Sequence, residues 1–135
     1  MQKILLINPN TSYETMAMMH RILNEALPAS IEVLSVSAGR GASMLTTESD
    51  LRVAADEVCR IGQARAGEVS AIVIGAFGDP GLDALQRAVA VPVCQHPDEC
   101  APHRLLRIAL WRRTLASLER WDYHQYKGLH LSAAR

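Results

Sequence analysis

The chain has 135 residues, with 14 basic and 14 acidic side chains, and 49% of its residues are hydrophobic. This length and composition fit one globular domain that can bury a core of its own. The zero net charge argues against a general nucleic-acid binder or membrane-surface binder. No apolar run approaches the roughly 20 residues of a membrane span, and the short apolar run after Lys3 is no signal peptide, so we expect a cytoplasmic protein.

The charge is divided unevenly on either side of Val93. Residues 1–93 hold 7 basic and 10 acidic side chains, whereas residues 94–135 hold 7 basic and 4 acidic ones. The second part also contains four of the five histidines and both tryptophans. We therefore expect an α/β domain over residues 1–93 and an unrelated basic tail over residues 94–135.

The chain begins with a predicted strand and helix. The run from Ile4 to Ile7 is apolar on both faces, as a central parallel strand is, and residues 8–10 end it. Thr11 and Glu14 form a capping-box pattern, which predicts a helix from about residue 12 that ends at Pro28. The helical spacing of its apolar residues places on the buried face Met16, Met19, Leu23 and either Ala26 or Leu27.

The later elements continue the alternation of strands and helices. A second strand over residues 31–36 precedes a long Ser- and Gly-rich loop over residues 37–47, and loops of this length tend to be functional. The predicted elements after it are a helix from Glu48 to about Ala66 stopped by Gly67, a strand over 69–74, a short helix from Leu82 to Ala88, and a strand over 89–93. This order predicts a flavodoxin-like parallel sheet with helices on both faces, which binds ligands beyond the carboxyl ends of its strands.

Two turn-rich segments follow the first and third strands and lie at that edge. Residues 8–12 carry amides, hydroxyls and the N–H groups of a helix N-terminus, which suit a carboxylate or a polarised carbonyl. Helix capping by Thr11 would explain the same residues without a ligand. The Gly- and Pro-rich residues 75–81 allow close backbone approach, or they form a plain turn in which Asp79 caps a helix opened by Pro80.

Together, these segments carry a resemblance to a known family. The strings Asn8-Pro9-Asn10-Thr11-Ser12, Glu48-Ser49 and Phe77-Gly78-Asp79-Pro80-Gly81 resemble the aspartate/glutamate/hydantoin racemase family, nearest its hydantoin and allantoin racemase branch. The resemblance covers residues 1–93, which would form one lobe of the two-lobed racemase fold. It implies an isomerase without cofactor or metal, in which one cysteine thiolate removes the α-proton and a second cysteine returns one on the opposite face.

The resemblance also implies which residues form the site. Asn10 and Thr11 would face a carbonyl or carboxylate of the substrate, while Phe77, Gly78 and Asp79 would place turn N–H groups toward a developing oxyanion. The family's first cysteine directly precedes the Phe-Gly-Asp-Pro-Gly string, where this chain has Ala76. The second cysteine belongs to a second domain, which we do not expect in this chain.

Catalysis is therefore not expected, because the alanine at the catalytic position, Ala76, has no proton to exchange. Two other functions stay open. One is a non-catalytic module that binds small carboxylates or cyclic ureides, and the other is an interaction protein that acts through its basic tail.

The three cysteines are an odd number without metal-like pairing, so we expect free thiols rather than a disulfide framework. Cys59 falls within the second predicted helix, where a buried inert thiol is expected. Cys94 follows the fourth strand but has no opposing acid. Cys94 and Cys100, with two nearby histidines at positions 96 and 103, match no zinc template in their spacing, so no metal site is predicted.

The tail contains a predicted basic amphipathic helix over about residues 104–120, with one apolar face formed by Ile108, Trp111, Leu115 and Leu118. This helix either docks on the domain or serves a partner helix or membrane surface. The abrupt change in composition after Val93 also suggests translation in a shifted reading frame. A second racemase-like domain in another frame would support that hypothesis.

The expected partners follow from the loss of a second lobe. A lone lobe would expose an apolar face, which favours self-association into a homodimer. The expected ligand is a small molecule, a cyclic ureide or an amino-acid derivative, and we expect neither a nucleic acid nor a membrane as partner.

Overall fold

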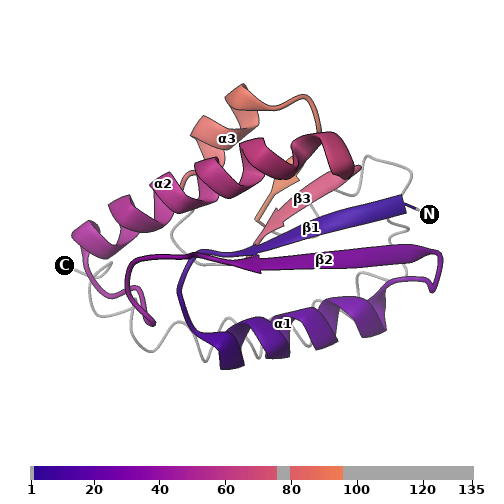
Figure 1. The fold of residues 1–135 in the computed structure, drawn as a ribbon, viewed down its shortest axis with the longest axis horizontal. Coiled ribbons are helices and arrows are strands. Elements are labelled where there is room, and N and C mark those ends of the chain that lie inside the picture. Colours follow the sequence, from indigo (N-terminus) through magenta and orange to yellow (C-terminus); the bar gives the residue numbers. More distant parts are fainter. Residues whose placement is uncertain (1, 76–79, 96–135) are drawn as a thin grey trace.

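A parallel four-stranded sheet lies between two layers of helices in the computed structural model, which describes residues 2–75 and 80–95 (Figure 1). The strands follow the order β2-β1-β3-β4, with the bounds β1 (Gln2–Asn8), β2 (Ile31–Ser37), β3 (Ala71–Ile74) and β4 (Val93–Cys94). Each neighbouring pair is parallel. This is the flavodoxin-like arrangement that the alternating elements predict, so the expected α/β fold is confirmed.

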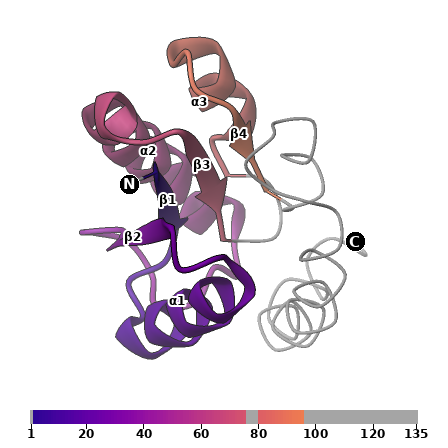
Figure 2. The same ribbon diagram turned by 90° about the vertical axis from the view of Figure 1, so that its right-hand side faces the viewer.

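Helices cover both faces of the sheet (Figure 2). Helix α1 (Tyr13–Ala26) packs on one face, and helices α2 (Glu48–Arg65) and α3 (Leu82–Ala88) pack on the other. The side chains of β1 alternate between the two layers, with Ile4 and Leu6 in the core under α1 and Leu5 and Ile7 in the core under α2 and α3. Because both faces of β1 are buried, its sequence is continuously apolar rather than alternating.

The predicted buried face of α1 is confirmed at Met16, Met19, Leu23 and Leu27. The predicted capping box is wrong by one residue. Helix α1 begins at Tyr13, and its N-cap is Ser12, whose Oγ accepts a hydrogen bond of 3.2 Å from the backbone N–H of Thr15. The N–H of Thr11 instead donates to the carbonyl of Ala42, at 3.1 Å, so a contact with a distant loop decides which residue caps the helix.

Helix α2 begins with a complete capping box. The Thr47 hydroxyl accepts from the N–H of Asp50, and the Asp50 carboxylate accepts from the N–H of Thr47. The backbone N–H of Thr46 is the main cause of a lowered pKa for Asp50. The helix ends at Arg65 and continues into a short 3-10 turn, η1 (Ala66–Glu68), close to the predicted stop at Gly67.

The last elements differ from prediction in their boundaries. Helix α3 covers the predicted residues, and its N-cap is Gly81, whereas the predicted cap, Asp79, lies outside the described residues. Strand β4 contains only two residues rather than the predicted five. The carbonyl of Pro92 already accepts from the N–H of Ile72, at 2.9 Å, but proline has no N–H to extend the ladder toward residue 89.

The predicted basic tail lies outside the described residues apart from positions 94 and 95, and so does its helix over residues 104–120. The tail and the domain boundary at Val93 therefore stay predictions. Among the helices of the described ranges, none combines the length and apolar composition that crossing a membrane requires.

Candidate functional site

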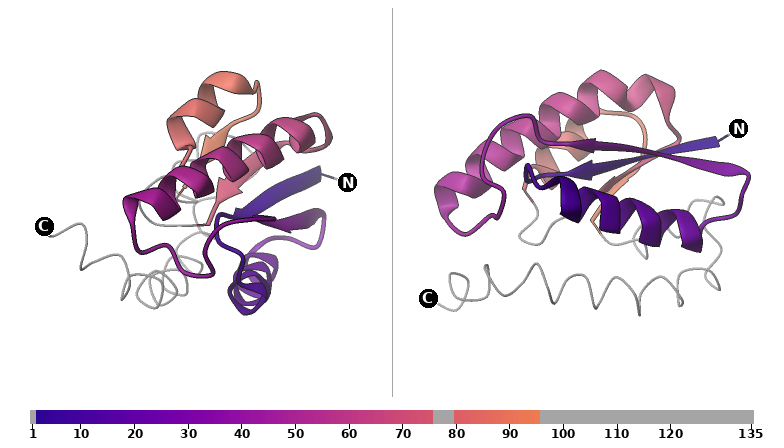
Figure 3. Two further views of the ribbon diagram at one scale, coloured as in Figure 1. Left: turned by 60° about the vertical axis from the view of Figure 1, so that its left-hand side comes forward. Right: turned by 60° about the horizontal axis from the view of Figure 1, so that its bottom comes forward.

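The candidate site lies where the chain leaves β1 at the centre of the sheet. Strand β1 pairs with β2 on one side and β3 on the other, which makes its carboxyl end the topological switch point where such sheets bind ligands. The residues that directly follow β2 and β3 form hydrogen bonds with this end of β1. The N–H of Gly75 donates to Ile7 across 2.8 Å, and the N–H of Ala38 donates to Asn8 across 2.8 Å. Figure 3 shows the segments after β1 and β2 leaving the sheet at the same end.

Asn8 organises the loop of residues 8–12, which we call the site loop. Its side chain is completely buried. The side-chain amide nitrogen lies 2.9 Å from Oδ1 of Asn10, 3.1 Å from the carbonyl oxygen of Ser12 and 3.3 Å from Oγ of Ser37. Its Oδ1 accepts a hydrogen bond of 3.2 Å from the N–H of Asn10. Asn8 therefore fixes the site loop and the end of β2 at once.

The sequence predicts amides of residues 8–12 that face a ligand or cap a helix, and it does not predict that Asn8 is buried and holds the loop from within. One signal was present. An asparagine directly after an apolar strand and before a proline has a side chain suited to bonding the backbone of the following turn.

Asn10 and Thr11, two of the predicted substrate residues, lie together in the site loop. Asn10 is 1% exposed, and its Oδ1 also accepts from the N–H of Ser12 at 2.9 Å. Thr11 is half-buried and is held through its backbone by Ala42. The loop thus has a fixed shape beside the first turn of α1, whose N–H groups favour an anionic or strongly polarised ligand atom.

The other predicted site residues, Ala76, Phe77, Gly78 and Asp79, lie outside the described residues. The structure does describe residues on either side of this segment, including Gly75 and Gly81. Gly75 pairs with β1, and Gly81 packs against α2 with a φ of 77°. A Cβ atom at Gly81 would lie 2.8 Å from the carbonyl oxygen of Ala55, so a glycine is needed at this contact.

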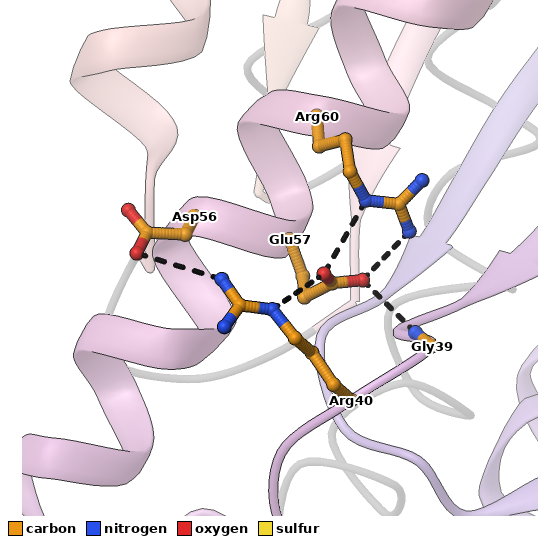
Figure 4. Close-up of polar contacts among 5 residues, drawn as sticks. All are labelled: Gly39, Arg40, Asp56, Glu57 and Arg60. Atoms are coloured by element: carbon orange, nitrogen blue, oxygen red, sulfur yellow. Dashed lines mark hydrogen bonds and ion pairs between the residues drawn. The ribbon is translucent and has the colours of Figure 1, made fainter.

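A buried carboxylate on α2 holds the loop that follows β2 (Figure 4). Glu57 is 3% exposed. Its Oε2 accepts from the N–H of Gly39 at 2.9 Å and from Nη2 of Arg60 at 2.7 Å, and its Oε1 accepts from Nε of Arg40 at 3.1 Å and from Nε of Arg60 at 3.3 Å. Arg40 also lies 3.9 Å from the Asp56 carboxylate. We call residues 38–47 the β2–α2 loop.

These donors stabilise the charged form of the carboxylate. The hydrogen bond from Arg60 contributes most to lowering the pKa of Glu57 from 4.5 to about 2, against the opposing effect of burial. The N–H of Gly39 and the guanidinium of Arg40 lower it further. Glu57 is not among the residues predicted from the sequence, although it lies three residues after Ala54 and four before Ile61, on the buried face of the helix.

The structure also places two of the three cysteines. Cys59 is a free, half-buried thiol on α2, and its Sγ lies 3.8 Å from the carbonyl oxygen of Gly81. Burial, followed by the nearby Asp56 charge, raises its pKa, which agrees with the predicted inert thiol. Cys94 is buried and disulfide-bonded. The expectation of free thiols throughout is therefore wrong, and a disulfide sulfur at position 94 offers no thiolate for catalysis.

Comparison with known proteins gives the family. The model for Asp/Glu/hydantoin racemases matches residues 4–114. The chain belongs to the Asp/Glu/hydantoin racemase family. This match confirms the family that the site-loop and Phe-Gly-Asp-Pro-Gly strings suggested, and it continues past Val93. No curated protein matches the chain significantly in sequence.

Solved allantoin racemases have a similar fold. The structure of allantoin racemase from Klebsiella pneumoniae is 26% identical, with a TM-score of 0.67, and the match covers 93% of this chain and 56% of that one. Allantoin racemase from Pseudomonas fluorescens is 17% identical with a TM-score of 0.67, covering 95% of this chain and 58% of that one, and this match concerns the fold alone. The chain thus spans little more than half the length of these two racemases.

The site loop and Gly75, which follows β3, lie at the same edge of the sheet. The described residues add two features to this arrangement. Asn8 fixes the site loop from within, and the β2–α2 loop supports it through Ala42.

Proposed function

We propose that this chain is a racemase-family lobe that binds a small cyclic ureide or amino-acid derivative at the site loop, and that it does not racemise the ligand on its own. Asn10 and Thr11 would contact a carbonyl or carboxylate of the ligand. Phe77, Gly78 and Asp79 would direct turn N–H groups toward a developing oxyanion, as the family resemblance implies. The substrate class rests on the similarity to allantoin racemases together with the polar groups of the loop.

The single observation that carries the binding proposal is the buried network of Asn8 and Asn10 at the switch point. Two buried asparagines are costly to place in a core unless their hydrogen bonds are satisfied. Here they fix the backbone of residues 8–12 beside the N-terminus of α1. Because the loop is already held in one conformation, little conformational entropy is lost when a ligand binds.

The absence of catalysis is proposed from Ala76. The two-thiol mechanism needs an acid–base group on each side of the stereocentre, and a methyl group can neither accept nor donate a proton. Two of the chain's three cysteines are unsuited to the task. Burial raises the pKa of Cys59, and Cys94 is held in a disulfide. We further propose that the chain acts without cofactor.

Calorimetric titration with allantoin, a 5-substituted hydantoin and L-aspartate tests the proposal. We expect heat of binding from at least one of them. Thr11→Val removes the proposed hydroxyl contact with little change in shape. Thr15→Val makes the same change in the first turn of α1 and keeps the backbone N–H that donates to Ser12 Oγ. Binding should weaken in the first variant and stay unchanged in the second. No binding of any of the three ligands, or equal binding by both variants, would contradict the proposal.

A further inference from the structure

Glu57 is the only buried charged side chain among the described residues, and the proposed ligand contacts do not use it. A buried carboxylate is costly unless it is paired and hydrogen-bonded. One of its partners, Arg60, lies on the same helix. The other two, Gly39 and Arg40, belong to the β2–α2 loop. Glu57 therefore joins α2 to a loop that comes 17 or 18 residues earlier in the chain.

The same loop holds the site loop from the other side. Two residues after Arg40, the carbonyl of Ala42 accepts the hydrogen bond of the Thr11 N–H, and one residue before Gly39, the N–H of Ala38 donates to Asn8. Residues 38–42 thus contact Glu57 on α2 and both ends of the turn that carries Asn10. These contacts form a short connection from the carboxylate to the proposed ligand residues.

The backbone between these contacts has little freedom to move independently. Gly41 has a φ of 104°, and a Cβ atom at this position would lie 3.1 Å from Cγ1 of Val53 on α2. The loop therefore packs directly on the helix through Gly41. Only Gly41 separates Arg40 from Ala42 in the chain, so the contacts with Glu57 and with Thr11 are made by neighbouring residues.

We infer that Glu57 is a positioning residue for the ligand site: its carboxylate fixes Gly39 and Arg40, so that Ala42 holds Thr11 in the binding position. Glu57 acts through the β2–α2 loop and does not itself contact the ligand. The ligand part of this inference rests on the proposed function. The coupling between Glu57 and Thr11 is a property of the free protein and is tested without ligand.

The experiment compares Glu57→Gln with Glu68→Gln in the full chain. Glu68 is a matched control, because it also accepts from an arginine three residues away, Arg65, but on the exposed surface. Amide hydrogen exchange by NMR is followed at Thr11 and, as a reference for global opening, at Leu6 in β1. In Glu57→Gln we expect exchange at Thr11 to accelerate about tenfold relative to Leu6, because the loop opens locally. Glu68→Gln should leave the ratio unchanged.

Calorimetry with allantoin as the probe then tests the ligand part. We expect the affinity of Glu57→Gln to fall about fivefold or more, and that of Glu68→Gln to stay at the wild-type value. Arg40→Gln is the second variant if Glu57→Gln does not fold. It removes one loop contact and leaves the Arg60 pair intact, so Thr11 should again exchange faster than Leu6.

The outcomes separate the two proposals. Equal acceleration at Thr11 and Leu6, or no acceleration at either, would overturn the inference, because Glu57 would then have only a general structural role. Faster exchange at Thr11 with unchanged allantoin affinity would also overturn it. If wild-type protein binds no allantoin, but Glu57→Gln accelerates amide exchange at Thr11 and not at Leu6, the coupling is supported and the proposed function is contradicted.

Discussion

The side-chain amide of Asn8 donates a hydrogen bond of 2.9 Å to Oδ1 of Asn10, and neither side chain is more than 1% exposed. The pair closes the turn that leaves the central strand. Because each asparagine also bonds backbone groups of the turn, the site loop has its shape before any ligand arrives. Removal of either side chain should therefore reduce stability and weaken the proposed ligand binding.

Asn8→Ala should destabilise the fold by about 2 to 3 kcal/mol, since it leaves buried polar groups without a partner and opens a small cavity. Asn24→Ala is the control, because Asn24 lies exposed on α1. It should change stability by less than about 0.5 kcal/mol. Urea unfolding followed by circular dichroism measures both. Similar effects of the two changes would show that the Asn8 contacts contribute little.

Gly81→Ala should destabilise the fold by about 2 kcal/mol or more, because a left-handed backbone penalises a Cβ atom. The new Cβ would also lie 2.8 Å from the Ala55 carbonyl oxygen. Gly67→Ala is the matched control, since no atom lies within 4 Å of a Cβ there. Thermal unfolding should separate the two variants. An unchanged midpoint for Gly81→Ala would mean that α3 can shift away from α2 without cost.

The low pKa of Glu57 predicts a loss of stability in acid. Its folded-state value, about 2, lies below the ordinary 4.5, so its contribution is complete above about pH 4.5 and is lost as the pH falls toward 2. The loss is on the order of 2 to 3 kcal/mol, after allowance for the exposed arginine partners. Urea unfolding at pH 6, 4 and 3 measures it.

Glu57→Gln should remove this part of the pH dependence, and Glu68→Gln should retain it. Parallel curves for wild type and Glu57→Gln between pH 6 and 3 would show that the carboxylate is not held in its charged form.

Ala76→Cys tests whether position 76 is that of the family's first cysteine. A single thiol faces one side of the stereocentre, so it can exchange the α-proton of only one enantiomer. We expect deuterium incorporation in D₂O from one enantiomer of the bound ligand and none from the other. Ala66→Cys, on η1 away from the site edge, controls for an added thiol. Equal incorporation by both variants would argue against this assignment.

The sequence predicts the sheet and helices well, because their apolar patterns reflect burial that is local to each element. The run from Ile4 to Ile7 and the stripe of α1 are confirmed for this reason. The N-cap of α1 was misplaced because Thr11 and Ser12 are both good caps. The choice depends on Ala42, which is 31 residues away from Thr11 in the sequence and invisible to a local pattern.

The candidate site was predicted in part. Its place at the carboxyl ends of β1 and β3 follows from topology, and the predicted ligand contacts of Asn10 and Thr11 stay predictions. Glu57 was missed because a charged residue on a helix normally faces water, and its loop partners become visible only in three dimensions. The disulfide at Cys94 was missed because an odd cysteine count indicates no framework.

The most direct test of the account is α-proton exchange by the wild-type chain. Single enantiomers of a 5-substituted hydantoin, allantoin and aspartate are incubated with the protein in D₂O, and deuterium at the stereocentre is followed by NMR against protein-free controls. The account predicts binding at the site loop and no protein-dependent deuteration of any of the three. Protein-dependent deuteration or loss of optical activity would show that the chain performs the proton transfer without a cysteine at position 76, and would contradict it.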